Sequence, residues 1–219
     1  LVGRIADIVT NHGGTVLLTE VPEMFGAEQQ LMNRASDEKV FRQIVAMINN
    51  FKKYFIDHKQ PIYENPSPGN MAGGITTLEE KSLGAIQKGG SAIVSQVHEY
   101  GEPVQHRGLA LLQAPGNDGV STTAEVASGA TMILFTTGRG TPLGLPVPTI
   151  KISSNTAIAQ KKPQWIDFNA GALLDGAAQN ELSEQLLQLI LQVASGEVKA
   201  KNEVNGYKEI AIWKEGVTL

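Results

Sequence analysis

The sequence predicts an α/β protein, with a mostly parallel sheet flanked by helices on both faces in a Rossmann-like three-layer arrangement. Three observations lead to this fold class. Short apolar runs recur along the chain and are typical of strands that are buried on both faces. Helical patterns separate these runs, as they do in βαβ units. Polar or glycine-rich loops follow several of the runs, at the positions where such sheets bind ligands.

The N-terminal part of the chain predicts three helices and one strand. The pattern before Gly13 is helical, and residues 15–23 read as a buried strand followed by a turn. A helix begins within residues 26–35. The clearest helix spans residues 37–55, with Asp37 as its N-cap. One face of that helix carries the apolar residues Phe41, Ile44, Val45, Ile48 and Phe55.

The rest of the chain continues the alternation. Residues 65–77 predict a loop with two prolines, which leads into a helix from about Leu78 to Lys88 capped by Thr76 or Thr77. The later elements, in order, are a strand at 91–97, a strand and turn at 108–118, a helix at 121–129, a strand with a glycine loop at 130–144, a strand, turn and short helix at 149–162, an extended segment at 165–171, a helix at 180–196 and a tail strand at 209–219. No repeat or linker interrupts this order, so we expect one domain over residues 1–219.

The composition argues against several classes of protein. The net charge is −4 and no basic cluster is present, which argues against a nucleic-acid partner. No apolar run approaches the roughly 20 residues that cross a bilayer, so we expect no membrane partner. The chain has no cysteine, which excludes disulfides and thiolate metal ligands within it.

Four polar loops follow predicted strands, at residues 19–23, 114–118, 136–141 and 151–156. If the sheet is parallel, these loops share one edge of it. The loop 136–141, "TTGRGT", has neither the Walker A spacing nor the G-x-G-x-x-G spacing. Its Arg139 has a guanidinium that suits a carboxylate or a phosphate, although an ordinary turn with a solvated arginine explains the pattern equally well.

Glu20 and Glu23 are the best candidates for metal ligands. They follow a predicted central strand, and Pro22 fixes the turn between them. Carboxylates suit hard or borderline divalent ions, but two acids on a surface turn are the simpler explanation. The histidines show no H-x-x-x-H spacing and are interpreted as non-catalytic. Any metal site must therefore use oxygen ligands or be completed from outside this chain.

The stretch "NPSPGNMAGGITTLEEKSLGAIQKGG", residues 65–90, is dense in amide and hydroxyl side chains. Such groups suit a substrate with many hydroxyls, and they equally suit tight turns. The candidate substrate-binding residues, here and in the loops after two later strands, are Asn65, Ser67, Asn70, Thr76, Thr77, Thr137, Gly138 and Asn155.

Long motifs in this chain closely resemble the altronate dehydratase (altronate hydrolase) family, which also includes galactarate dehydratase. The resemblance runs through the whole chain and is carried by "GGTVLLTEVPEMFGAEQQLMNRA", "FKKYFIDHKQPIYENPSPGN", "LLQAPGND", "LFTTGRGTP", "PTIKISSNTAIAQKKPQWIDFNAG" and "EIAIWKEGVTL". The segments "TEVPEMFGAEQ" and "QPIYENPSPGN" favour altronate over galactarate as the substrate.

The resemblance implies a cytoplasmic hydro-lyase of hexuronate catabolism that converts D-altronate to 2-keto-3-deoxy-D-gluconate and water. It also implies a divalent metal, iron(II) or manganese(II). The family's proteins are longer and carry a cysteine- and glycine-rich segment upstream, so we expect a C-terminal domain that lacks part of the active site. The expected partners are a small sugar acid and the remaining domains, with a homo-oligomer left open. Galactarate dehydratase, or a non-catalytic sugar-acid-binding or oligomerisation module, is the alternative.

The implied reaction also suggests catalytic residues. Loss of water next to a carboxylate requires removal of the weakly acidic C2 proton and stabilisation of an enediolate. A metal or a cation stabilises that charge, and the candidate cations are Arg139, Lys151 and Lys81. An acid must also assist departure of the C3 hydroxyl. The sequence does not distinguish the base from the acid.

Overall fold

The computed structural model describes residues 1–62 and 66–216, which form two compact units. The larger unit contains Val2–Ser128 and the tail that begins at Ile212, and the smaller unit contains Gly129–Ala211 together with Leu1. The chain therefore leaves the larger unit after Ser128 and returns to it at Ile212. No helix in the described ranges is long and apolar enough to cross a membrane.

The larger unit is built on a three-stranded parallel sheet in the order β1-β3-β2. The strands are β1 (Thr15–Leu18), β3 (Gly108–Leu112) and β2 (Val94–His98). Its helical elements are α1 (Val2–Asn11), η1 (Val21–Met24), α2 (Glu28–Met32), α3 (Glu38–Asp57), α4 (Pro68–Ala72), α5 (Leu78–Ile86), η2 (Gln87–Gly89) and α6 (Asp118–Ala127).

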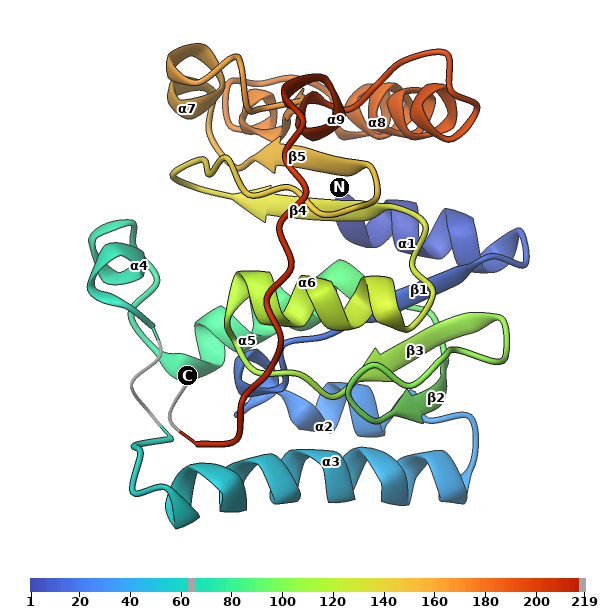
Figure 1. Ribbon diagram of the computed structural model, residues 1–219, viewed down its shortest axis with the longest axis vertical. Helices are drawn as coiled ribbons and strands as arrows, with labels where there is room; N and C mark the ends of the chain where they lie inside the picture. The colour runs from blue at the N-terminus through green and yellow to red at the C-terminus, as the bar shows by residue number, and fades with distance from the viewer. Residues whose placement is uncertain (63–65, 217–219) are drawn as a thin grey trace. The chain divides into compact units, whose positions relative to one another are not determined.

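Helices cover both faces of this sheet, as Figure 1 shows for α3 and α6. The alternation of side chains along β3 explains the two layers, because successive residues of a strand point to opposite faces. Leu109 and Leu111 pack into the main core with α3, whereas Leu112 packs with Ala124 of α6. The loops that follow β1 and β3 are thereby held at one edge of the sheet.

The smaller unit has its own three-stranded parallel sheet in the order β4-β5-β6. The strands are β4 (Ile133–Thr137), β5 (Thr149–Ser153) and β6 (Phe168–Asn169). The helical elements of this unit are α7 (Thr156–Lys161), η3 (Ala170–Leu173), α8 (Gln179–Ala194) and α9 (Lys201–Asn205). The predicted parallel α/β class is confirmed. The strands are divided between two sheets, so the prediction that the four polar loops share one edge is wrong. Two of these loops follow strands of the larger unit's sheet, and the other two follow strands of the smaller unit's sheet.

Several local predictions are confirmed and three are wrong. Asp37 caps α3 by accepting a hydrogen bond from the Val40 amide at 2.9 Å. Phe41, in contrast, is 40% exposed, because the buried face of α3 runs through Val40, Ile44 and Phe51. A short helix, α4, lies within the stretch expected to be a loop.

The third wrong prediction is the tail strand, because residues 209–216 contain no strand. The tail is held by aromatic side chains of the larger unit instead. The ring of Trp213 stacks on Phe51 at 5.6 Å and meets Tyr54 and Tyr100 edge-on. The Tyr54 hydroxyl accepts a hydrogen bond from the Gly216 amide at 2.9 Å. These contacts replace the ladder that a strand would form.

Candidate functional site

The loops after β1 and β3 meet at the edge of the larger unit's sheet. The Val21 amide donates to the Ala114 carbonyl at 3.0 Å, and the Thr19 hydroxyl donates to the Leu112 carbonyl at 3.1 Å. Asn117 caps α6 by accepting a hydrogen bond from the Val120 amide, so α6 starts at this edge. Of the four loops predicted to share one edge, these two do so.

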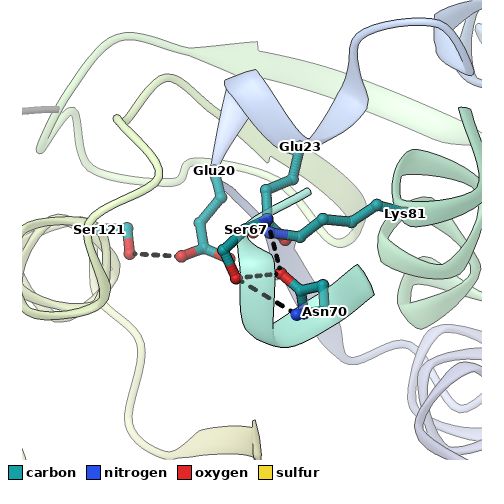
Figure 2. Close-up of polar contacts among 6 residues, drawn as sticks. All are labelled: Glu20, Glu23, Ser67, Asn70, Lys81 and Ser121. Atoms are coloured by element: carbon teal, nitrogen blue, oxygen red, sulfur yellow. Dashed lines mark hydrogen bonds and ion pairs between the residues drawn. The ribbon is translucent and has the colours of Figure 1, made fainter. Parts of the chain in front are cut away.

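Glu20 lies at the centre of this edge in an unusual backbone conformation. Its φ and ψ angles are 65° and 62°, in the left-handed region that is costly for a residue with a Cβ. The Glu23 amide donates to the Glu20 carbonyl at 2.8 Å and closes the turn that contains Pro22. This turn directs the Glu20 side chain toward α6, where the Ser121 hydroxyl donates to its Oε1 at 3.3 Å (Figure 2).

Four acids that influence one another gather here, and we call Glu20, Glu23, Asp118 and Glu125 the carboxylate cluster. Burial, then the charges of Glu23 and Asp118, raise the pKa of Glu20 to about 8, against the opposing effect of Lys88. Burial and the charge of Glu20 raise the pKa of Glu125 to about 8 as well. Burial and the charge of Glu23 also raise the pKa of Asp118. The cluster therefore contains carboxyl groups that exchange protons near neutral pH.

Lys81 of α5 forms an ion pair with Glu23 of η1, with 2.7 Å between Nζ and Oε1 (Figure 2). Both side chains are largely buried, so this pair is less screened by solvent than a surface pair. The predicted catalytic cation Lys81 and the predicted metal ligand Glu23 are therefore in direct contact.

The candidate substrate-binding residues before α5 are occupied by local contacts. Ser67 and Asn70 form a reciprocal cap at the start of α4. The Thr77 hydroxyl accepts from the Glu80 amide, and the Glu80 carboxylate in turn accepts from the Thr76 amide at 2.9 Å. These side chains serve helix ends in this conformation, as the turn-building alternative expects. Asn65 lies outside the described residues.

The smaller unit places Lys151 away from solvent. Its side chain on β5 is fully buried, and its Nζ donates to the carbonyls of Leu143 at 2.6 Å and Pro142 at 3.2 Å. Burial lowers the pKa of Lys151, while the charges of Asp167 and Glu209 oppose that effect. An ammonium group held in this way supports the chain segment after β4.

The other predicted residues of the smaller unit lie in the loops after β4 and β5. Arg139 is exposed. The Asn155 amide group donates to the Gly138 carbonyl at 3.0 Å, and the Thr137 hydroxyl accepts from the Gly140 amide at 2.9 Å. Thr137, Gly138 and Asn155 therefore shape the loop that carries Arg139.

The carboxylate cluster does not form a complete metal site. Within residues 1–62 and 66–216, no group of three histidine, aspartate or glutamate side chains is arranged to hold an ion. Glu23 is paired with Lys81, and Glu20 with Ser121. The donor set that the structure describes therefore does not fit a metal by itself.

Sequence reasoning missed four residues of this edge, namely Ser121, Glu125, Asp118 and Lys88. Asp118 lies within the loop 114–118 but was not singled out by its pattern. Ser121 and Glu125 are four residues apart in a predicted helix, so that spacing places both on the face nearest the loop. No pattern in the sequence predicted that Lys88 acts on these acids, because its distance from them depends on how α5 and η2 pack.

The chain matches known proteins over its full length. A family model described as D-galactarate/Altronate dehydratase, C-terminal, matches residues 1–218. The altronate dehydratase of Escherichia coli (strain K12) is 56% identical over 219 residues, and that of Bacillus subtilis (strain 168) is 53% identical over 220 residues. Each of these matches covers 100% of this chain and 44% of the relative. Galactarate dehydratase (L-threo-forming) of Escherichia coli (strain K12) is 36% identical over 215 residues, which is 97% of this chain and 41% of the relative.

Proposed function

Because the chain belongs to the D-galactarate/altronate dehydratase family, we propose that it works as the C-terminal part of an altronate dehydratase. The proposed reaction is loss of water from D-altronate to give 2-keto-3-deoxy-D-gluconate, in cytoplasmic hexuronate breakdown. The observation that carries this proposal is the identity of 56% and 53% with two altronate dehydratases, against 36% with galactarate dehydratase. The chain spans less than half the length of these relatives, so the activity is that of a longer protein.

The carboxylate cluster supports this chemistry because the reaction needs a base and an acid. A base works best when its pKa lies near the working pH, and the pKa of Glu20 is raised to about 8. We assign removal of the C2 proton to Glu20, which Ser121 orients through its hydroxyl. The second group with a raised pKa, Glu125, is the proposed source of the proton for the leaving C3 hydroxyl.

Positive charge is needed where the enediolate forms. Lys81 supplies a fixed ammonium beside Glu23, and its ion pair keeps it at the edge where Glu20 lies. A preorganised cation of this kind stabilises a developing negative charge without rearrangement. Lys151 is left out of the proposal, because its ammonium is bound to two backbone carbonyls.

In the smaller unit, Arg139 is the proposed ligand of a substrate carboxylate. Its guanidinium is exposed and presents a planar fork that a carboxylate binds through two parallel hydrogen bonds. Arg139→Lys replaces that fork by a point charge and is expected to raise the KM for altronate about tenfold or more. An unchanged KM would remove Arg139 from the proposal.

The divalent metal implied by the family is assigned to the longer protein and not to this chain alone. The described residues do not form a complete site, so further ligands for the ion would come from the rest of the longer protein. After dialysis against metal-free buffer, the full-length protein is expected to retain iron(II) or manganese(II), and the 219-residue chain is expected to lose it. Tight, stoichiometric binding by the chain alone would contradict this assignment.

The experiment that tests the function uses a protein that contains this chain at the full length of its relatives. It is incubated with ferrous or manganous ion and either D-altronate or galactarate, and the 2-keto-3-deoxy acid product is measured. We expect product from altronate. Product from galactarate only would assign the chain to the sister enzyme. Binding of altronate without turnover would favour a sugar-acid-binding module.

A further inference from the structure

The loop that carries Arg139 is held by the side chains of three residues. Thr137 accepts from the Gly140 amide at 2.9 Å, and Asn155 donates to the Gly138 carbonyl at 3.0 Å. The third contact comes from Lys162, whose Nζ donates to the Arg139 carbonyl at 2.7 Å and to the Gly140 carbonyl at 3.1 Å. The backbone on both sides of the Arg139 side chain is therefore fixed, while the side chain itself is exposed.

Lys162 is built into this position rather than resting on the surface. Its Nζ lies 4.9 Å from the centre of the Trp165 ring, which is within the range of a cation–π contact. Its aliphatic stem packs against Gly140, where an added Cβ would approach the Lys162 Cδ at 2.8 Å. Gly140 also has a φ of 73°, so both its conformation and its lack of a side chain allow this packing.

We infer that Lys162 is a positioning residue that fixes the 137–141 loop and thereby orients Arg139 toward the carboxylate of a sugar acid. This inference rests on the proposed role of Arg139. An ammonium group has three donors and no acceptor, so it can bind two consecutive carbonyls at once. These charge-assisted bonds set the direction in which the Arg139 Cα–Cβ bond leaves the loop. Lys162 acts through Arg139 and does not touch the substrate.

The matched variants are Lys162→Met and Lys161→Met. Lys161 is the exposed neighbour at the end of α7, and its substitution removes the same charge without touching the loop. In the full-length enzyme, Lys162→Met is expected to raise the KM for altronate about tenfold, because small displacements of a binding group are costly, with kcat changed less than about twofold. Lys161→Met is expected to leave both constants unchanged, and Lys162→Arg to restore much of the KM.

A double-mutant cycle decides whether Lys162 works through Arg139. In an Arg139→Ala background, Lys162→Met is expected to raise the KM no further, because the residue that it positions is already gone. Full additivity of the two effects would overturn the inference. A loss in kcat with an unchanged KM would also overturn it.

Amide hydrogen exchange tests, without reference to turnover, whether Lys162 holds the 137–141 loop in place. The Gly140 amide of the 219-residue chain is expected to exchange at least several-fold faster in Lys162→Met than in wild type or Lys161→Met. If the enzyme dehydrates neither sugar acid, the proposed function fails. Faster exchange of the Gly140 amide in Lys162→Met would still show that Lys162 fixes the loop. Unchanged exchange in Lys162→Met would overturn the inference whatever the activity.

Discussion

At the scale of single residues, Glu20 combines two features that oppose folding. It holds a left-handed backbone conformation, and its carboxyl group lies among other acids in partly buried surroundings. A glycine would remove the backbone strain, and a neutral side chain would remove the repulsion. Strained or destabilising residues of this kind are typical of active sites. We therefore interpret Glu20 as a catalytic residue.

The raised pKa of Glu20 predicts how stability depends on pH. The folded state binds a proton more tightly than the unfolded state, so the chain loses stability as pH rises from about 4.5 to about 8. Glu20→Gln is expected to remove roughly 1–3 kcal/mol of that loss, while Glu125 leaves a residual slope. Urea unfolding at intervals from pH 4.5 to 9 measures this. Parallel wild-type and variant curves would show that Glu20 is not perturbed.

For Lys151 we expect a loss of stability, because in the structure its ammonium donates hydrogen bonds to two backbone carbonyls. Lys151→Met removes the donors to Leu143 and Pro142 and leaves both oxygens without their partner. The expected cost is about 2–4 kcal/mol of unfolding free energy. Calorimetry of the 219-residue chain measures it. An unchanged Tm together with a large loss of kcat in the longer protein would return Lys151 to the catalytic residues.

At the scale of elements, local signals in the sequence predicted where helices begin. Asp37 is a cap in the structure as expected, and Thr77 is the cap where Thr76 or Thr77 was expected, because a cap depends only on residues within one turn. The start of α4 has an equally local signal, which the sequence analysis overlooked. Ser67 and Pro68 begin α4 as an N-cap and a first-turn proline, although the surrounding glycines suggested a loop.

The capping box of α5 gives a prediction at this scale. Thr77→Ala removes the acceptor of the Glu80 amide and is expected to cost about 1 kcal/mol. Ser67→Ala at the five-residue, exposed α4 is the matched control and is expected to cost less. An unfolding free energy of Thr77→Ala equal to that of wild type would indicate that α5 gains nothing from its cap.

Features that depend on distant parts of the chain were not predictable from the pattern. The buried lysine of β5 looks like a polar residue of a half-exposed strand until residues 142–143 are seen beside it. The acids of the carboxylate cluster come from η1, from the residue before it and from α6, and the approach of these segments depends on the pairing of β1 with β3. The tail read as a strand because its aromatic and branched residues suit a strand as well as they suit an aromatic cluster.

At the scale of the whole molecule, the chain from Val2 onward passes between its units twice, after Ser128 and before Ile212. The second passage ends in the tail that Phe51, Tyr54 and Tyr100 hold through Trp213. The fold of the larger unit is therefore completed only by residues from the end of the chain.

Removal of the Trp213 ring is expected to destabilise the larger unit. Trp213→Ala should cost roughly 2–4 kcal/mol and speed proteolysis of the tail, because it deletes a ring that packs against the main core. Ile212→Ala is the control, since Ile212 is 72% exposed. Chemical unfolding and limited trypsin digestion of both variants provide the comparison. If Trp213→Ala were as stable as wild type, the Trp213 ring would contribute nothing to the fold.

The turnover rate of Glu20→Gln in the full-length enzyme tests the central claim, that the carboxylate cluster performs the acid–base chemistry of dehydration. Wild type is expected to dehydrate D-altronate with a kcat/KM that rises as the pH approaches about 8, because a base acts when it is deprotonated. Glu20→Gln is expected to lose about 10²-fold or more in kcat while folding normally. A kcat within twofold of wild type, with the same pH profile, would contradict the account.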